Sequence, residues 1–328
     1  MRRSSVSGLV TALIGLGLLA WMVWSVGVAK IVADVRQVGW MLIAIVAIGG
    51  VRFLLRAAAW RQCLEPPHRL SLADAFAAVV SGDTIGNITP LGPLVGEPAK
   101  AAFVRSRVAL GPALTALAIE NVLYTLSTAA MIAAGMVALL ISFQTPSAIR
   151  GVGELAVAGT LVLFGVALWM LWRQPALISR ALALAPPLRR HSERIQEIES
   201  RIYTFTSRHR GRLPLLAVTE VSFHVFGVAE NYLTLWALLG VAPPLLIAFI
   251  LETVNRLITV VFRFIPMRLG VDEVGTGYLT QLLGLGVSVG TSIAIIRKLR
   301  ILSWALVGGI LLVREGLTQR PQVPPDQR

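Results

Sequence analysis

Long apolar stretches constrain this chain more than any other feature of its sequence. Several run to about 20 predominantly apolar residues, the length that an α-helix needs to cross a hydrocarbon core about 30 Å thick. The chain of 328 residues is 55% hydrophobic and only 14% charged, whereas soluble domains carry far more charge. Because backbone polar groups in lipid must bond within their own segment, the sequence predicts an all-α, polytopic integral membrane protein.

We expect about six spanning helices and two broken segments in a single transmembrane domain, 1–328. The expected spanning helices cover residues 8–28, 39–59, 114–143, 155–172, Leu213–Leu239 and 292–313. Residues 1–29 resemble a signal peptide but end without a small-x-small cleavage site, so we interpret them as a retained helix. The broken segments are 72–107 and 245–290, and residues 314–328 are expected to form a flexible tail.

Basic residues predict the orientation of the chain. The net charge of +13 gathers in loops and termini, which suits cytoplasmic anchoring and excludes nucleic acid as a partner. With a cytoplasmic N-terminus, the segment 173–212 and its nine arginines lie inside, and only Lys30, Arg36 and Arg150 lie outside. The sequence therefore predicts a multi-pass protein of the inner (cytoplasmic) membrane with both termini in the cytoplasm. Within the basic segment, residues 192–203 have the amphipathic pattern of an interfacial helix.

This orientation also requires two re-entrant hairpins. The first broken segment must enter and leave on the cytoplasmic side, and the second on the outer side. Two broken hairpins of opposite orientation are typical of inverted-repeat transporters. We therefore expect an inverted repeat.

Glutamates inside apolar segments are the first candidates for function. They are Glu97, Glu120, Glu220, Glu230, Glu252 and Glu273. Each ionisable group costs about 2.5–3.5 kcal/mol at the bilayer centre on insertion scales. They must either pair with arginines such as Arg52, Arg256 or Arg263, or line a water-filled or headgroup-lined cavity.

Helical spacing aligns these glutamates with other polar residues. Three predicted stripes hold Glu120, Tyr124 and Thr128; Glu220, His224, Gly227 and Asn231; and Glu252, Asn255, Arg256, Thr259 and Arg263. Polar stripes on otherwise apolar helices are shielded from lipid only if they face each other. Glu220 and His224 are also possible metal ligands, but two ligands without a third favour a buried hydrogen-bonded pair. The single cysteine, Cys63, forms no internal disulfide, and we expect no metal or other cofactor.

The first broken segment suggests a helix that restarts within the membrane. Pro98 follows Gly96 and Glu97, which predicts a new helix with Pro98 at its first helical position. The free N–H groups of such an end attract phosphate, whereas Glu97 would accept an amine or cap the helix. The sequence leaves these alternatives open.

The same residues resemble a known family. Asn87-Ile88-Thr89-Pro90, with Gly96-Glu97 and Lys100, resembles the N-x-x-P…G-E-x-x-K signature of the lysylphosphatidylglycerol synthase transmembrane region, or flippase-like domain. Pro266 and the run from Gly270 to Glu273 are similar to the second signature of that family. The resemblance covers nearly the whole chain.

Three departures from the family pattern are visible. Residues 91–95 are inserted in the first signature, Met267-Arg268-Leu269 replace the usual glycines, and Asp272 stands where a basic residue is common. Without these glycines, the resemblance does not imply the family's close backbone packing at the second hairpin, nor the family's usual substrate. These features are similar to the hopanoid-associated branch of the family.

The resemblance implies translocation of a lipid between leaflets. The expected substrates are an anionic or aminoacylated phospholipid or a hopanoid-type lipid, and lipid-biosynthesis enzymes are possible partners. Bifunctional members carry a soluble domain that makes the aminoacyl lipid, and this chain, which ends at Arg328, is not expected to do so. Without a Walker motif, ATP hydrolysis is not expected, although protonation of a buried glutamate would offer coupling to a proton gradient.

The residues expected along the translocation path come from both broken segments and from the polar stripes. They are Asn87, Pro90, Gly96, Glu97, Lys100, Glu120, Glu220, His224, Glu252, Asn255, Arg256, Pro266, Gly270 and Glu273. Two alternatives use the same features. A membrane-embedded enzyme would use the carboxylates and His224, and a scaffold would recruit enzymes through the arginine-rich segment.

Overall fold

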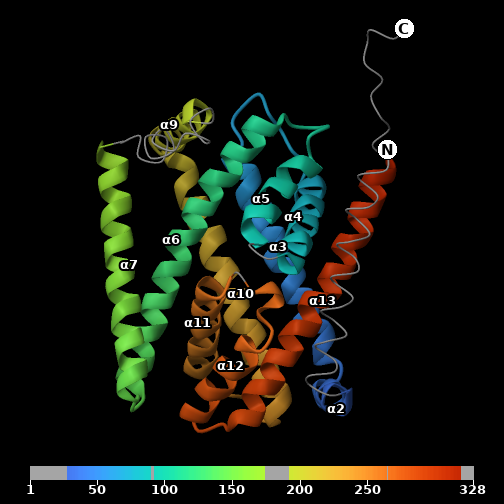
Figure 1. The fold of residues 1–328 in the computed structure, drawn as a ribbon, viewed down its shortest axis with the longest axis vertical. Helices are drawn as coiled ribbons and strands as arrows, with labels where there is room; N and C mark the ends of the chain where they lie inside the picture. The colour runs from blue at the N-terminus through green and yellow to red at the C-terminus, as the bar shows by residue number, and fades with distance from the viewer. Residues whose placement is uncertain (1–27, 90–91, 174–191, 264, 319–328) are drawn as a thin grey trace.

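The computed structural model describes residues 28–89, 92–173, 192–263 and 265–318, and the described chain is helical throughout, without strands. Figure 1 shows the arrangement. The helices are α2 (Val28–Val38), α3 (Met41–Cys63), α4 (Leu72–Ile88), α5 (Gly92–Phe103), α6 (Leu110–Ser142), α7 (Ser147–Arg173), α9 (Ser192–Arg208), α10 (Leu213–Leu239), α11 (Leu245–Val261), α12 (Val271–Leu282) and α13 (Val287–Thr318), with short 3₁₀ turns at Arg210–Arg212 and Pro266–Arg268.

The structure confirms a polytopic, all-α membrane protein. Among the described residues, four helices are long and apolar enough to cross a membrane: Met41–Cys63, Leu110–Ser142, Ser147–Met170 and Arg210–Leu239. These correspond to four of the six predicted spans. The first predicted span, 8–28, lies outside the described residues except for Val28, which begins α2. The last corresponds to α13, whose apolar sequence is interrupted by Arg297, Lys298 and Arg300.

The ends of several elements differ from the prediction. The region between the first two predicted spans forms the short helix α2, and Gly39, at φ +56°, separates it from α3. The predicted last helix, 292–313, is longer at both ends, because α13 runs from Val287 to Thr318. The predicted interfacial helix, 192–203, continues to Arg208 as α9, where Tyr203 and Phe205 are buried.

Two helical hairpins stand at opposite ends of the molecule. Each pairs a helix of 17 residues with one of 12: α4 with α5, and α11 with α12. A helix of 12 residues is about 18 Å long, too short to span a hydrocarbon core of about 30 Å. In Figure 1 the first hairpin occupies the upper half and the second the lower half. The two broken segments therefore form hairpins of opposite orientation, as the sequence predicts.

The packing of the hairpins follows an inverted repeat. The series α3–α4–α5–α6 and α10–α11–α12–α13 run in opposite directions through the molecule in Figure 1. The helix α4 of the first series packs on α13 of the second. In the same way, α11 of the second series packs on α6 of the first. The first helices of the two series, α3 and α10, pack against each other at the centre. The pairing brings the polar residues of both series together.

The prediction of a helix that restarts at Pro98 is wrong. The helix α5 begins at Gly92 and continues through Pro98. Glycines explain this result, since a Cβ at Gly96 would lie 2.8 Å from the carbonyl oxygen of Gly82 in α4. The close backbone contact between α4 and α5 stabilises α5 on both sides of the proline, which loses only one internal hydrogen bond.

Candidate functional site

A cavity of about 440 Å³ lies between the two hairpins and the central helices. This volume falls within the range of small-molecule sites. Among the described residues that line it, eight are basic and two, Asp83 and Glu97, are acidic. The basic residues are Arg52, Arg56, Lys100, Arg256, Arg263, Arg268, Arg297 and Arg300. The cavity wall is therefore strongly cationic.

Apolar side chains also line the cavity. They include Ile132 of α6, Leu163 of α7 and Val260 of α11. Val260 is 49% exposed and lies on α11, in the second hairpin. The lining of this cavity thus combines a group of cations with apolar side chains, of which Val260 is half-exposed.

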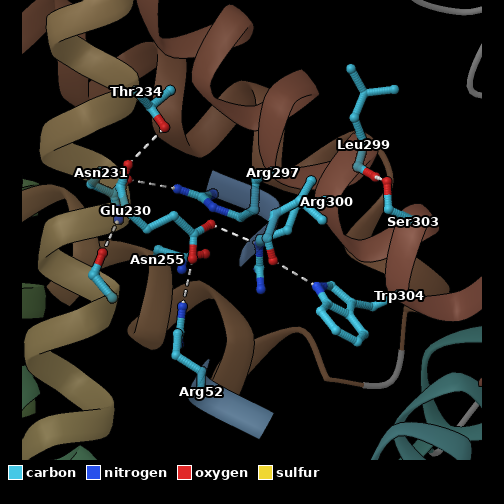
Figure 2. A network of polar contacts seen from close by, with 12 residues as sticks. Arg52, Glu230, Asn231, Thr234, Asn255, Arg297, Leu299, Arg300, Ser303 and Trp304 are labelled. Atoms are coloured by element: carbon cyan, nitrogen blue, oxygen red, sulfur yellow. Dashed lines mark hydrogen bonds and ion pairs between the residues drawn. The ribbon is translucent and has the colours of Figure 1, made fainter. Parts of the chain in front are cut away.

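Buried carboxylates stand behind the cavity arginines. Glu230 lies 2.8 Å from Nη1 of Arg52 and 2.8 Å from Nε of Arg300, and it joins α10 to α3 and α13. Figure 2 shows both arginines directed at Glu230, with Arg297 pointing to the side-chain oxygen of Asn231. These ion pairs hold the guanidinium groups in place.

Glu252 is the second carboxylate of this layer. It accepts hydrogen bonds from Arg256, Asn231 and Asn255, and its other cation is Arg52 at 3.4 Å. Its side chain lies directly against Gly227, where a Cβ would overlap the carboxylate. The predicted stripes of α10 and α11 therefore do face each other, and Gly227 provides the space.

Arg56 and the stripe of α6 form the adjacent part of the wall. The Arg56 guanidinium lies 2.8 Å from Glu120 and stacks on the Tyr124 ring at 3.9 Å from its centroid. It also donates to the side chain of Asn121. An aromatic ring on one side and a carboxylate on another fix the orientation of this cation.

The first hairpin contributes an acid–base pair. Lys100 donates to Glu97 at 2.6 Å within α5, and Glu97 also accepts from Asn121 of α6 at 3.0 Å. Glu97 therefore neither caps a helix nor stands free to take an amine. Asn87 donates to Asp83 at 2.7 Å along α4. Of the predicted residues here, Gly96 packs on α4, and Pro90 lies outside the described residues.

The second hairpin contains a similar pair. Glu273 lies 2.5 Å from the Lys298 amine and accepts the backbone N–H of Gly270, which has φ +81°. Next to it, the fully buried Asp272 lies 3.5 Å from Arg268. Two departures from the family pattern thus compensate each other, because Arg268 and Asp272 form an ion pair.

The predicted hydrogen-bonded pair of Glu220 and His224 is not formed. His224 lies 3.1 Å from the Ser127 hydroxyl, and no hydrogen bond joins it to Glu220 within the described residues. Side chains at i and i+4 share a helix face, but here α6 provides the nearer partner. The described residues also contain no cluster of three or more His, Cys, Asp or Glu residues that could hold a metal ion.

Several cavity residues were not among the predicted site residues. Arg297, Arg300 and Trp304 follow one face of α13, at the spacing of helical neighbours, and all three line the cavity. The spacing of these three residues is visible in the sequence and could have predicted them as site residues. Arg56 and Asn121 had no such pattern, since only the packing of α3 against α6 makes them polar neighbours. The predicted residue Pro266 lies in the 3₁₀ turn that precedes α12.

The family model described as "Lysylphosphatidylglycerol synthase TM region" matches residues 8–309. The searches of curated proteins and of solved structures found no match. The match covers most of the chain, so the chain belongs to the family of lysylphosphatidylglycerol synthase transmembrane regions, membrane proteins of lipid metabolism or transport.

Proposed function

We propose that this member of the lysylphosphatidylglycerol synthase transmembrane family moves a lipid with an anionic headgroup between the leaflets of the membrane. The observation that carries the proposal is the cavity whose lining combines eight cationic side chains with apolar ones, of which Val260 is half-exposed. A free anion would need only the first feature. A lipid needs both, because its headgroup and its chains must be accommodated together.

The charges of the cavity favour a phosphate-bearing headgroup. Guanidinium groups bind phosphate oxygens through paired N–H donors, and seven of the eight lining cations are arginines. An aminoacylated headgroup would bring a further cation into this field. An uncharged hopanoid-type lipid would leave the arginines without a counter-charge. Among the expected substrates, an anionic phospholipid therefore fits the cavity best.

The inverted repeat supplies a means of movement. The two hairpins approach the cavity from opposite ends of the molecule, and each contributes lining residues. Rocking of one series against the other would open the cavity alternately to the two leaflets while the headgroup stays among the arginines. The lipid chains would remain outside, near the apolar side chains of Leu163 and Val260.

The test measures lipid translocation in proteoliposomes. Headgroup-labelled anionic, zwitterionic and aminoacylated lipids are followed with an impermeant quencher. We expect faster translocation of the anionic lipid than in protein-free vesicles, and little change for the other two.

Arg263→Gln is the informative variant. Arg263 is exposed, lines the cavity and has no ion pair within the described chain, so its loss leaves no carboxylate unpaired. We expect translocation of the anionic lipid to slow several-fold, while Arg150→Gln, at an exposed position of α7, leaves the rate unchanged. Equal rates for all three lipids, or no acceleration of any, would contradict the proposal.

A further inference from the structure

Behind the cavity wall formed by Arg56 and Tyr124 lies a second polar cluster, between α6 and α10. It contains Glu120, Glu220 and His224, which are 1%, 3% and 7% exposed. Ser127 of α6 contacts His224 and Glu220, and the Arg56 guanidinium contacts Glu120. Two carboxylates are thus enclosed with little polar compensation.

The charges of this cluster do not balance. Arg56 pairs with Glu120, and Glu220 has no ion pair within the described part of the chain. The nearby cations have other partners. Arg52 pairs with Glu230 and Glu252, Lys100 with Glu97, and Arg256 with Glu252. One available cation therefore faces two carboxylates.

The surrounding groups provide no second cation that forms an ion pair with Glu220 among the described residues. The charged and titratable groups around the two glutamates are Arg52, Arg56 and Cys63 of α3, Glu97 and Lys100 of α5, Tyr124 of α6, Arg212 before α10, His224 of α10 and Arg256 of α11. Arg212 donates to backbone carbonyls of Gln62 and Leu64. A charged imidazole at His224 would face both Arg52 and Arg56, so His224 does not replace the missing cation.

We infer that Glu120 and Glu220 together bind one exchangeable proton. A single proton reduces the charge of the pair to −1, which Arg56 balances. Two like-charged carboxylates that share a site cannot both remain ionised without a large electrostatic penalty. A metal ion is the less suitable ligand, since no group of three or more His, Cys, Asp or Glu side chains among the described residues could hold one.

Arg56 connects this proton site to the cavity. Its guanidinium contacts Glu120 on one side and lines the cavity on the other. An anion that binds Arg56 neutralises positive charge that balances the carboxylate pair. Binding of a second proton to the pair then becomes more favourable. By linkage, protonation of the pair strengthens anion binding to the same extent. This coupling, unlike the proton site itself, rests on the proposed function.

Infrared difference spectroscopy of the full chain in phosphatidylcholine nanodiscs tests the proton site. We expect a protonated-carboxyl C=O band at pH 7, where an exposed glutamate, with a pKa of about 4.3, is ionised. The band should correspond to one carboxyl group and disappear at higher pH. Glu220→Gln and Glu120→Gln should each remove it completely, because the remaining glutamate alone is balanced by Arg56.

Two further variants make the result specific. Glu154→Gln, at an exposed position of α7, should leave the band unchanged. Arg56→Gln should double it, because neither carboxylate then has a cation, and this variant still tests the inference if a glutamine variant does not fold. Persistence of the band in Glu220→Gln overturns the inference. So does loss of the band when sodium replaces choline, since the site would then bind sodium.

The coupling is tested separately in weakly buffered solution. Adding short-chain phosphatidylglycerol should cause proton uptake by the parental protein, whereas short-chain phosphatidylcholine should not. Absence of uptake with an intact carboxyl band would contradict the coupling and count against the proposed function, while the proton site would stand. Absence of the band with normal lipid translocation would overturn the proton site alone.

Discussion

Each arginine at the centre of the cavity is held by a carboxylate that is itself buried. Arg52, Arg56, Arg256 and Arg300 all have such a partner within 4 Å. The side chains that line the cavity are mostly basic, and the carboxylates behind them offset part of this charge. A buried ion pair contributes little net stability, but removal of one partner leaves an uncompensated charge. We therefore expect substitutions of these carboxylates to affect the stability of the fold more than the binding of a ligand.

Glu230→Gln tests this arrangement at the residue scale. Arg52 and Arg300 both lose their 2.8 Å contact with a carboxylate, and we expect the free energy of unfolding to fall by about 3 kcal/mol. The measurement is reversible unfolding in detergent micelles.

The double variant Glu230→Gln, Arg300→Gln should recover about 1 kcal/mol or more of that loss, because one of the two unpaired cations is also removed. Glu154→Gln, at an exposed position, is the control and should have no effect. Strictly additive effects of the two central substitutions would show that Glu230 does not hold Arg300.

At the scale of elements, the hairpins depend on close backbone contact. The helices α4 and α5 meet through glycines, and a Cβ at Gly82 would overlap the stem of Lys100 and lie 2.8 Å from the Gly96 carbonyl oxygen. Helices in lipid associate through such close packing, because burial of apolar side chains offers little gain there. The position of Lys100 and Glu97 beside the cavity follows from this contact.

Gly82→Ala should therefore separate the hairpin and destabilise the protein by about 1–3 kcal/mol, the usual effect of overpacking. Gly159→Ala is the matched control, since no atom lies within 4 Å of the added Cβ. That substitution should be neutral or slightly stabilising, because alanine is the better helix former. Thermal unfolding of both variants in the same detergent compares them, and equal melting temperatures would contradict the packing argument.

At the scale of the whole molecule, the inverted repeat predicts which loops share a side of the membrane. The loop between α3 and α4 and the loop between α10 and α11 lie at opposite ends in Figure 1. The distribution of basic residues predicts that the first is cytoplasmic. Cys63 is 1% exposed, so the parental chain gives a low labelling background.

Cysteine labelling of intact cells checks this topology. Val241→Cys, at a position 65% exposed after α10, should react with a membrane-impermeant maleimide. Arg69→Cys, before α4, should react only after the membrane is permeabilised. The reverse pattern would invert the predicted orientation, and labelling of both from outside would contradict the opposite placement of the two loops.

The sequence by itself determined the class of fold and most of its elements. Apolar length predicts spans because a helix must cross a fixed hydrocarbon thickness, and four of the six predicted spans are found among the described residues. The prolines and glycines of the two broken segments, together with the distribution of basic residues, predicted hairpins of opposite orientation. Helical spacing also placed Glu252 and Asn231 on facing stripes, and the structure brings them together.

Only the tertiary structure decided how the charges are paired. Arg52 and Glu230 are 178 residues apart in the chain, and nothing in their local sequence links them. The same holds for Ser127, which rather than Glu220 is the partner of His224, and for Pro98, which the contact with α4 keeps inside a helix. Pairing across helices depends on which faces meet and at what depth. Local periodicity specifies the faces of each helix, but the packing of the two series determines their register.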